Sequence, residues 1–432
     1  MKKFALLLWT VFWINSLAVS QPKIKQYVKR NVVNINSISI TDTNYSDLQN
    51  IGDAIGNARV VMLGEQDHGD APTFMAKARL VKYLHEKLGF NVLAFESDFY
   101  GLTAGFEQVL ESKLPIDSLL NNNLFPLWTT CVQFEEMFKY ISNSYGGNSK
   151  LYVAGIDNFL HGDVTQKSFK QNVHSFIVSS GIPFSKQRGY TDVFLPLLDT
   201  VLYHSRWQTS FIDTSQIEAL LVHIDTILVQ LKRSQLTGYF MSVAIENLGS
   251  TCRHLLLKES KTYSDRFIER DKQMAANLTW LLKTKYPSEK IIVWAANGHV
   301  IKNALDAIEL KEYRHPSLGF LFTQQSEFAK QTYVLGFTSY QGTAGRTTYQ
   351  DGVYSFSTPK GESFEQWVYS KSRPYAFVDF KRFASANPHF TEMFKLNAES
   401  HFPQNGIWTK CFDGIFYVKD MYACEKTNRN SL

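Results

Sequence analysis

Acidic and imidazole side chains follow four short apolar runs of the sequence, in each case where the run ends. These residues are Glu65 and His68, then Glu96, then Asp157, and finally Asn297 and His299. A neutral imidazole can take a proton from water near neutral pH, and a carboxylate on its other nitrogen fixes the tautomer. The residue types therefore indicate general base chemistry by His68, with Glu65 or Glu96 as the carboxylate partner.

The familiar nucleophile and phosphate motifs do not occur in the sequence. There is no G-x-S-x-G, no Walker A motif and no G-x-G-x-x-G, and His85-Glu86 is not completed to H-E-x-x-H. These absences favour water as the nucleophile over serine or cysteine. Gly69, directly after His68, is expected to let a ligand approach the backbone closely.

The elements that must position these residues form a repeating strand and helix pattern. Residues 59–64 and 90–95 read as buried strands, and residues 74–88 between them have helical spacing. Such a unit makes its two strands parallel. Two more apolar strands are expected at 151–155 and 291–295, the second after a helix over 265–286. Because ligands bind beyond the carboxyl ends of parallel strands, the four strand ends should converge on one cleft.

The remaining chain completes an α/β fold with a mostly parallel central sheet and flanking helices. Residues 160–285 are mostly helical, with an amphipathic helix over 216–232, and are expected to cover the strand ends. Additional strands are expected at 332–340, 352–356, 375–380 and 414–418. The predicted segments are a lead-in over 21–58 with one short helix, catalytic segments over 59–159 and 286–424, and the helical cover over 160–285.

The first 20 residues match a secretory signal peptide. Lys2 and Lys3 precede an apolar run, and a small-x-small cleavage pattern ends at Ser20. We therefore expect an exported protein, periplasmic or secreted, with no stable membrane span after cleavage. The net charge of +5 includes two signal-peptide lysines, and no dense basic cluster indicates nucleic acid. A small-molecule substrate is expected, and the oligomeric state is left open.

The four cysteines permit disulfides in an exported protein, although the sequence does not determine their pairing. They are Cys131, Cys252, Cys411 and Cys424, and the last two are close enough in sequence to pair. Buried free thiols are an equally good interpretation. No C-x-x-C occurs, which argues against a zinc ribbon.

Several of these segments resemble the erythromycin esterase family in order and spacing, from about residue 59 to 420. The segments are Gly64-Glu65-Gln66-Asp67-His68-Gly69, Lys77-Ala78-Arg79-Leu80, Gly89-Phe90, Phe95-Glu96, Gly155-Ile156-Asp157, Arg270-Asp271 with Met274, Ala275 and Asn277, and Trp294-Ala295-Ala296-Asn297-Gly298-His299-Val300. The late landmarks Gly336-Phe337, Gly342 and Phe412-Asp413 match more weakly.

The resemblance implies hydrolysis of a macrolactone, as in macrolide antibiotic resistance, or of another ester. It assigns His68 as general base, and it places Glu65, Glu96 and His299 at further active-site positions. Lys77, Arg79, Asp157, Arg270, Asp271 and Asn297 are the expected substrate-binding residues, and Lys77 or His299 could stabilise the oxyanion. The chain departs from the family pattern at Lys77, where the family has arginine, and at Ala296, where it has histidine.

Two other interpretations of the same cluster stay open. His68, His299, Glu65 and Glu96 are also plausible ligands of zinc or manganese, as in a metal-dependent hydrolase or peptidase. Alternatively, the two departures mark a catalytically degenerate protein that binds an envelope component. The preferred expectation is a hydrolase that uses no metal or other cofactor.

Overall fold

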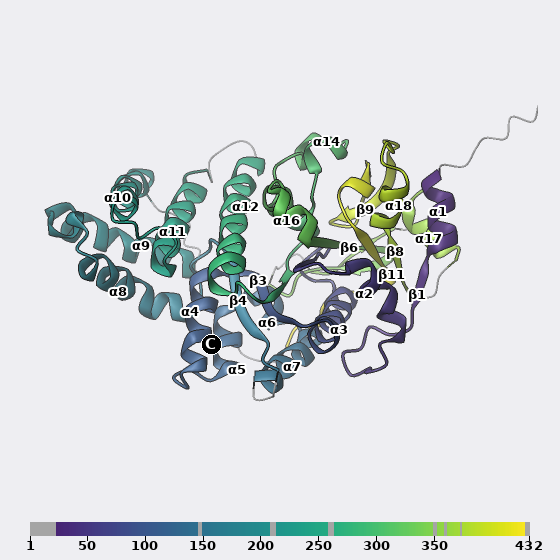
Figure 1. Cartoon of the computed structure of the whole chain (residues 1–432), viewed down its shortest axis with the longest axis horizontal. Coiled ribbons are helices and arrows are strands. Elements are labelled where there is room, and N and C mark those ends of the chain that lie inside the picture. The colour runs from purple at the N-terminus through teal and green to yellow at the C-terminus, as the bar shows by residue number, and fades with distance from the viewer. Residues whose placement is uncertain are drawn as a thin grey trace, which may run out of the picture.

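The computed structural model describes residues 23–145, 149–207, 213–257, 263–348, 352–357, 361–371 and 374–427. Within these residues, nine strands form one sheet (Figure 1), in the order β1-β8-β11-β6-β2-β5-β3-β4 with β7 on β6. Their bounds are Val33–Ile35 (β1), Val60–Leu63 (β2), Phe90–Asp98 (β3), Tyr152–Asp157 (β4), Lys290–Trp294 (β5), Thr332–Ala344 (β6), Tyr354–Phe356 (β7), Tyr375–Asp379 (β8) and Gly414–Met421 (β11).

The strands from β11 to β4 pair in parallel, and β1, β7 and β8 pair antiparallel with their neighbours. The predicted mostly parallel sheet is therefore confirmed, and strands from both predicted catalytic segments interleave in it. Trp294 of β5 is in register with Leu63 of β2 on one side and with Phe95 of β3 on the other. This register brings the carboxyl ends of three strands into line.

Both faces of the sheet are buried, which explains why its central strands are apolar throughout. Val61 and Leu63 belong to the hydrophobic core on one face, with α3 (Ala71–Leu88) and α7 (Glu135–Tyr145). Val60 and Met62 belong to the core on the other face. The helices that contribute to this second core include α1 (Lys23–Asn31), α12 (Tyr263–Trp280), α15 (Leu318–Thr323), α17 (Phe364–Tyr369) and α18 (Phe380–Ala386).

The predicted helical segment extends from the β4 edge of the sheet (Figure 1). It contains α8 (Asp163–Ser179), α9 (Leu195–Trp207), α10 (Thr214–Arg233), α11 (Phe240–Leu256) and α12. The expected apolar stripe of α10 is buried at Ile217, Leu220, Ile224, Ile227 and Leu231. The segment reaches the strand ends through α11 and α12, where Asn277 Nδ2 donates to the Ile156 carbonyl and Thr251 Oγ1 donates to the Asn158 carbonyl.

The chain contains more structure than the sequence predicted, for example in the lead-in and in a C-terminal hairpin. The lead-in holds α1 and β1 in addition to the short helix α2 (Gln49–Ile55). A separate hairpin is formed by β9 (Phe394–Glu399) and β10 (Phe402–Gly406). These short elements escape prediction because β1 and β10 have no clear apolar alternation and α1 buries only Ile24 and Val28. The predicted signal peptide lies outside the described residues.

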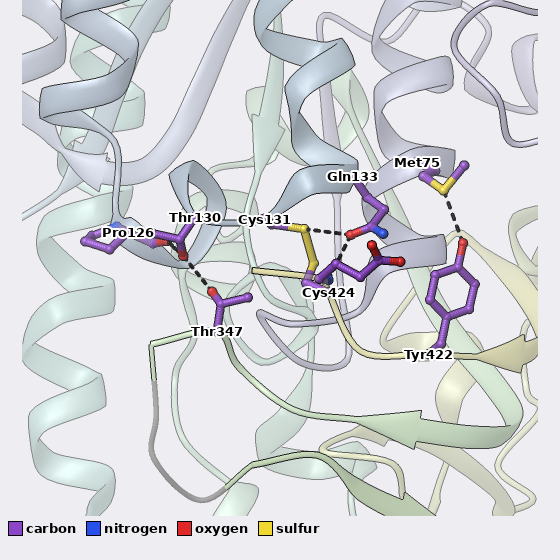
Figure 2. Close-up of a disulfide and its surroundings, with 9 residues drawn as sticks. Met75, Pro126, Thr130, Cys131, Gln133, Thr347, Tyr422 and Cys424 are labelled. Atoms are coloured by element: carbon purple, nitrogen blue, oxygen red, sulfur yellow. Dashed lines mark hydrogen bonds between the residues drawn. A yellow bond between two sulfur atoms is a disulfide. The ribbon is translucent and has the colours of Figure 1, made fainter. Parts of the chain in front are cut away.

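One disulfide joins Cys131 to Cys424 across 293 positions of the chain (Figure 2). The pairing of Cys411 with Cys424 that proximity suggested is therefore wrong, and Cys252 and Cys411 are buried free thiols. The disulfide anchors the C-terminal tail beside the loop after β2, because Cys424 N–H donates to the Gly69 carbonyl over 2.8 Å. Among the described helices, none combines the length and the apolar character that crossing a membrane requires.

Candidate active site

The loop after β2 is held in place by close backbone contacts. Asn297 N–H donates to the Glu65 carbonyl over 2.8 Å, and a Cβ on Gly64 would lie 2.0 Å from Asn297 Oδ1. A Cβ on Gly69 would lie 2.0 Å from the Gly345 carbonyl oxygen. The absence of a side chain at Gly69 therefore makes room for the backbone at Gly345. Both glycines let the loop carrying His68 pack against its neighbours.

His68 is the outer member of a chain of three charged or polar side chains. Its Nδ1 lies 2.7 Å from Glu65 Oε1, and Lys77 Nζ donates to Glu65 Oε2 over 2.6 Å. Lys77 and Glu65 are fully buried, whereas 12% of the His68 side chain is exposed. Lys77 also donates to the Ala295 carbonyl and lies 4.2 Å from the Trp294 ring centroid. Lys77 therefore holds Glu65, and Glu65 in turn orients the His68 ring.

Arg270 of α12 is the centre of a second group at the ends of β3 and β4. Its Nη2 donates to Glu96 Oε1 and to Asp157 Oδ2, each over 2.6 Å. Its Nη1 lies 3.0 Å from His299 Nε2. The other ring nitrogen of His299, Nδ1, lies 2.7 Å from Asp271 Oδ1. Two acids and one imidazole thus surround a single guanidinium, of which 12% is exposed.

Glu96 joins the two groups into one site. Its Oε1 lies 3.8 Å from His68 Nε2 and 3.2 Å from His299 Nε2, and its Oε2 accepts the Ala296 N–H. The structure therefore brings together His68, Glu65, Glu96 and His299, the four residues that the sequence placed in one cleft. Lys77, Asp157, Arg270 and Asp271 join them. His68 Nε2, the nitrogen that Glu65 leaves free, faces Glu96 Oε1.

The charges of this cluster are set by its members' mutual contacts. Burial alone would raise the pKa of Glu96, but His299, Arg270 and His68 hold that pKa well below its ordinary value. Burial alone would lower the pKa of His299, whereas Asp271 and Glu96 raise it to about 10. Glu96 is therefore a carboxylate and His299 an imidazolium at neutral pH. Burial lowers the pKa of Lys77 to about 8, against the opposing effect of Glu65.

Two predicted substrate-binding residues do not join the cluster. The buried Arg79 guanidinium donates to both Asp47 carboxylate oxygens over 2.9 Å and to the Ser37 and Asn44 carbonyls, so it anchors the lead-in. The Asn297 amide donates to the Phe337 and Ala398 carbonyls, which ties the site to β6 and β9. The polar groups of both side chains therefore form hydrogen bonds that hold the fold together. Lys77 is fully buried as well, and its ammonium group is bonded to Glu65 and to the Ala295 carbonyl.

Sequence reasoning missed an aromatic border and one acid of this site. Trp128 of α6 (Pro126–Thr129) packs edge-on against His68, with centroids 6.0 Å apart. Phe267 stacks on His299, and Phe159 lies 5.1 Å from the Arg270 guanidinium carbon. Glu399, the last residue of β9, has its carboxylate beside Gly298, the residue before His299. Phe159 and Phe267 lie within three positions of the predicted site residues Asp157 and Arg270. Trp128 and Glu399 belong to no motif that the sequence analysis identified.

The described residues contain no group of three or more histidine, cysteine or acidic side chains that could hold a metal ion. Arg270 is the cation that lies among Glu96, Asp157 and His299. The positive charge at the centre of the cluster is therefore supplied by the chain itself. Which cofactor, if any, the protein uses stays a prediction.

Comparison with known proteins shows similarity to one family in sequence and a shared fold in structure. The family model described as erythromycin esterase matches residues 232–420. YbfO of Bacillus subtilis strain 168, which carries the name of a hydrolase, is 25% identical over 360 residues, covering 79% of each chain. Erythromycin esterase type II of Escherichia coli is 24% identical, over 89% of this chain and 94% of the relative.

The solved structure of the erythromycin esterase EreC, a mutant in its open conformation, superimposes with a TM-score of 0.68 at 16% identity. The superposition covers 90% of this chain and 97% of EreC. This similarity shows a shared fold, and it confirms the predicted α/β class. The names of the relatives indicate a hydrolase. The matched family model, the related sequences and the shared fold agree in one respect: each shows similarity to the erythromycin esterase family.

Proposed function

We propose that the chain hydrolyses a carboxylic ester or lactone with water as the nucleophile and His68 as the general base. The observation that carries this proposal is the chain Lys77–Glu65–His68, which leaves His68 Nε2 facing the Glu96 oxygen that binds Arg270. A base whose second nitrogen is held by a buried carboxylate is the arrangement that general base catalysis requires.

In the proposed reaction, His68 Nε2 takes a proton from water while the water oxygen bonds to the carbonyl carbon. The carbonyl π electrons move to oxygen and form a tetrahedral oxyanion, which Arg270 and the imidazolium of His299 stabilise. When this intermediate collapses, the bond between the carbonyl carbon and the leaving oxygen breaks. The leaving oxygen takes a proton, so that one ester and one water give one acid and one alcohol.

We assign the oxyanion role to Arg270 and His299, because Lys77 is fully buried and bonded to Glu65. Both are cationic at neutral pH, and both keep part of their surface exposed, at 12% and 3% of the side chain. The aromatic border of Trp128, Phe159 and Phe267 supports an apolar or ring-shaped substrate. The name of the Escherichia coli relative makes a macrolactone the first ester to be tested.

The test is turnover of an ester panel that includes erythromycin and simple alkyl and aryl esters. His68→Ala should lower kcat by about 10²-fold to 10⁴-fold, the usual contribution of a general base. Full activity in that variant would refute the proposed base. Elemental analysis of the purified protein, with and without chelator, decides between this chemistry and metal-dependent hydrolysis. Tight binding of an envelope component without any turnover would favour a degenerate site.

We also propose that the protein is exported, on the strength of its first 20 residues. Edman sequencing of the mature protein from a bacterial expression host should begin at Gln21. A mature chain that still begins at Met1 would contradict cleavage at that position.

A further inference from the structure

Glu399 stands at the tip of the β9–β10 hairpin, where the backbone has an unusual conformation. Ser400 and His401, the two residues of the turn, have φ values of +48° and +59°. Glu399 and Phe402, on either side of them, are paired across the hairpin. Residues other than glycine adopt such positive φ angles where the surroundings enforce them, and these sites cluster at functional positions.

The surroundings that enforce this turn are the segments carrying the proposed catalytic residues. Ser400 N–H donates to the Gln66 carbonyl over 3.1 Å, and Gln66 Nε2 donates to the Asn397 carbonyl over 2.6 Å. Asn297 Nδ2 donates to the Ala398 carbonyl over 2.6 Å. Hydrogen bonds to residues on both sides of Glu399 therefore fix its backbone against the loop of His68 and against α13 (Asn297–Val300).

The Glu399 carboxylate is directed at α13, beside His299. A Cβ on Gly298 would lie 2.7 Å from Glu399 Oε1, so the absence of a side chain at Gly298 makes room for the acid. His299 and Asp271 act on this carboxylate electrostatically, and the buried Cys411 thiol lies in its field. In the described part of the chain, no side chain or backbone group is hydrogen-bonded to the Glu399 carboxylate. The residue is partly exposed.

An acid that lies close to a cation and has no hydrogen-bond partner among the described residues is available to a substrate. We propose that Glu399 is the general acid of the site and that it protonates the leaving oxygen. This inference rests on the proposed ester hydrolysis. Every other acid of the cluster is already bonded to a cation or to a backbone N–H, whereas Glu399 keeps its carboxyl group free for proton transfer.

The proton transfer completes the reaction without any further reagent. As the bond between the carbonyl carbon and the leaving oxygen breaks, Glu399 gives its proton to that oxygen and becomes a carboxylate. His68 then releases the proton that it took from water, and Glu399 is reprotonated from solvent. The acidity of Glu399 also suits this role. Burial raises its pKa to about 7, against the opposing effect of His299. A general acid works best when its pKa lies near the pH at which the enzyme acts.

The experiment compares two esters that differ in their need for a general acid. A p-nitrophenyl ester leaves as a stable phenolate, whereas the matching alkyl ester must have its leaving oxygen protonated. Glu399→Gln keeps the size of the side chain and should lower kcat on the alkyl ester by about 10²-fold or more, with little change on the p-nitrophenyl ester. For the alkyl ester, the fall of kcat/KM above about pH 7 should disappear in this variant.

Two further variants serve as a second test and as a control for the role of Glu399. Gly298→Ala should displace the carboxylate and reproduce the selective loss, and Glu392→Gln, at an exposed position just before β9, should leave both activities unchanged. Equal losses on both esters in Glu399→Gln, or no loss on either, would overturn the role of Glu399. If His68→Ala still abolishes turnover in that case, the proposed function stands. If the wild-type protein hydrolyses no ester, both inferences fall together.

Discussion

The buried ion pair of Lys77 and Glu65 makes a quantitative prediction for Lys77→Met. The charged atoms are 2.6 Å apart and both side chains are fully buried. Their attraction is about 6 kcal/mol at an effective dielectric constant of ~20. The burial cost of Lys77 opposes this attraction and lowers its pKa from 10.5 to about 8, which corresponds to about 3 kcal/mol.

Removing Lys77 alone leaves the Glu65 carboxylate buried without its cation. We expect Lys77→Met to lower the free energy of unfolding by about 3–5 kcal/mol, the range for a broken buried pair. Activity should also fall, because Glu65 would no longer hold the His68 ring. Adding Glu65→Gln to Lys77→Met removes the uncompensated charge and should restore much of the stability but not the activity. Lys77→Arg, which introduces the residue type of the family pattern, should keep both charges.

The assay is urea unfolding at pH 7, with the midpoint and the slope m fitted for each variant. Lys167→Met is the matched control, because Lys167 forms an exposed pair with Asp163 that should contribute less than about 1 kcal/mol. A loss below about 1 kcal/mol in Lys77→Met, or a double variant no more stable than the single one, would refute a dominant role for this ion pair.

Two other predictions concern the pH dependence of stability and the disulfide. His299 has its pKa raised from 6.5 to about 10, so its stabilising contribution is complete below pH 6.5 and is lost as the pH rises through 10. Urea unfolding at steps across that window should show a smaller decline in His299→Gln than in the wild type, and parallel declines would contradict the raised pKa. Replacing Cys131 and Cys424 by serine should cost about 2–5 kcal/mol. Reductant should destabilise the wild type but not this double variant, and equal sensitivity would show that the disulfide does not stabilise the fold.

The strand ends of the site could be predicted because each strand is a short apolar run that stops at polar residues. This pattern predicted Glu65, His68, Glu96 and Asp157 at the carboxyl ends of strands in one parallel sheet. The family motifs added Arg270 and Asp271, which lie on a helix where periodicity alone does not separate a site residue from a solvated face.

The remaining features depend on contacts between distant parts of the chain. Lys77 and Arg79 are two positions apart on α3, yet one binds Glu65 and the other Asp47, because the helix is buried on more than one side. The partner of Cys424 is 293 positions away, so sequence proximity favoured the wrong thiol. Glu399 lies in a hairpin whose turn has no glycine, and its place beside Gly298 follows from tertiary structure alone.

The position of β2 in the middle of the sheet has a consequence for biosynthesis. β2 delivers Glu65 and His68, but the strands on its two sides, β5 and β6, come from the second half of the chain. A growing polypeptide therefore exposes an apolar strand with two open edges until the ribosome has made most of the protein. We expect chaperone contact during this interval, and slow formation of the catalyst after release, because contacts between distant segments fold late.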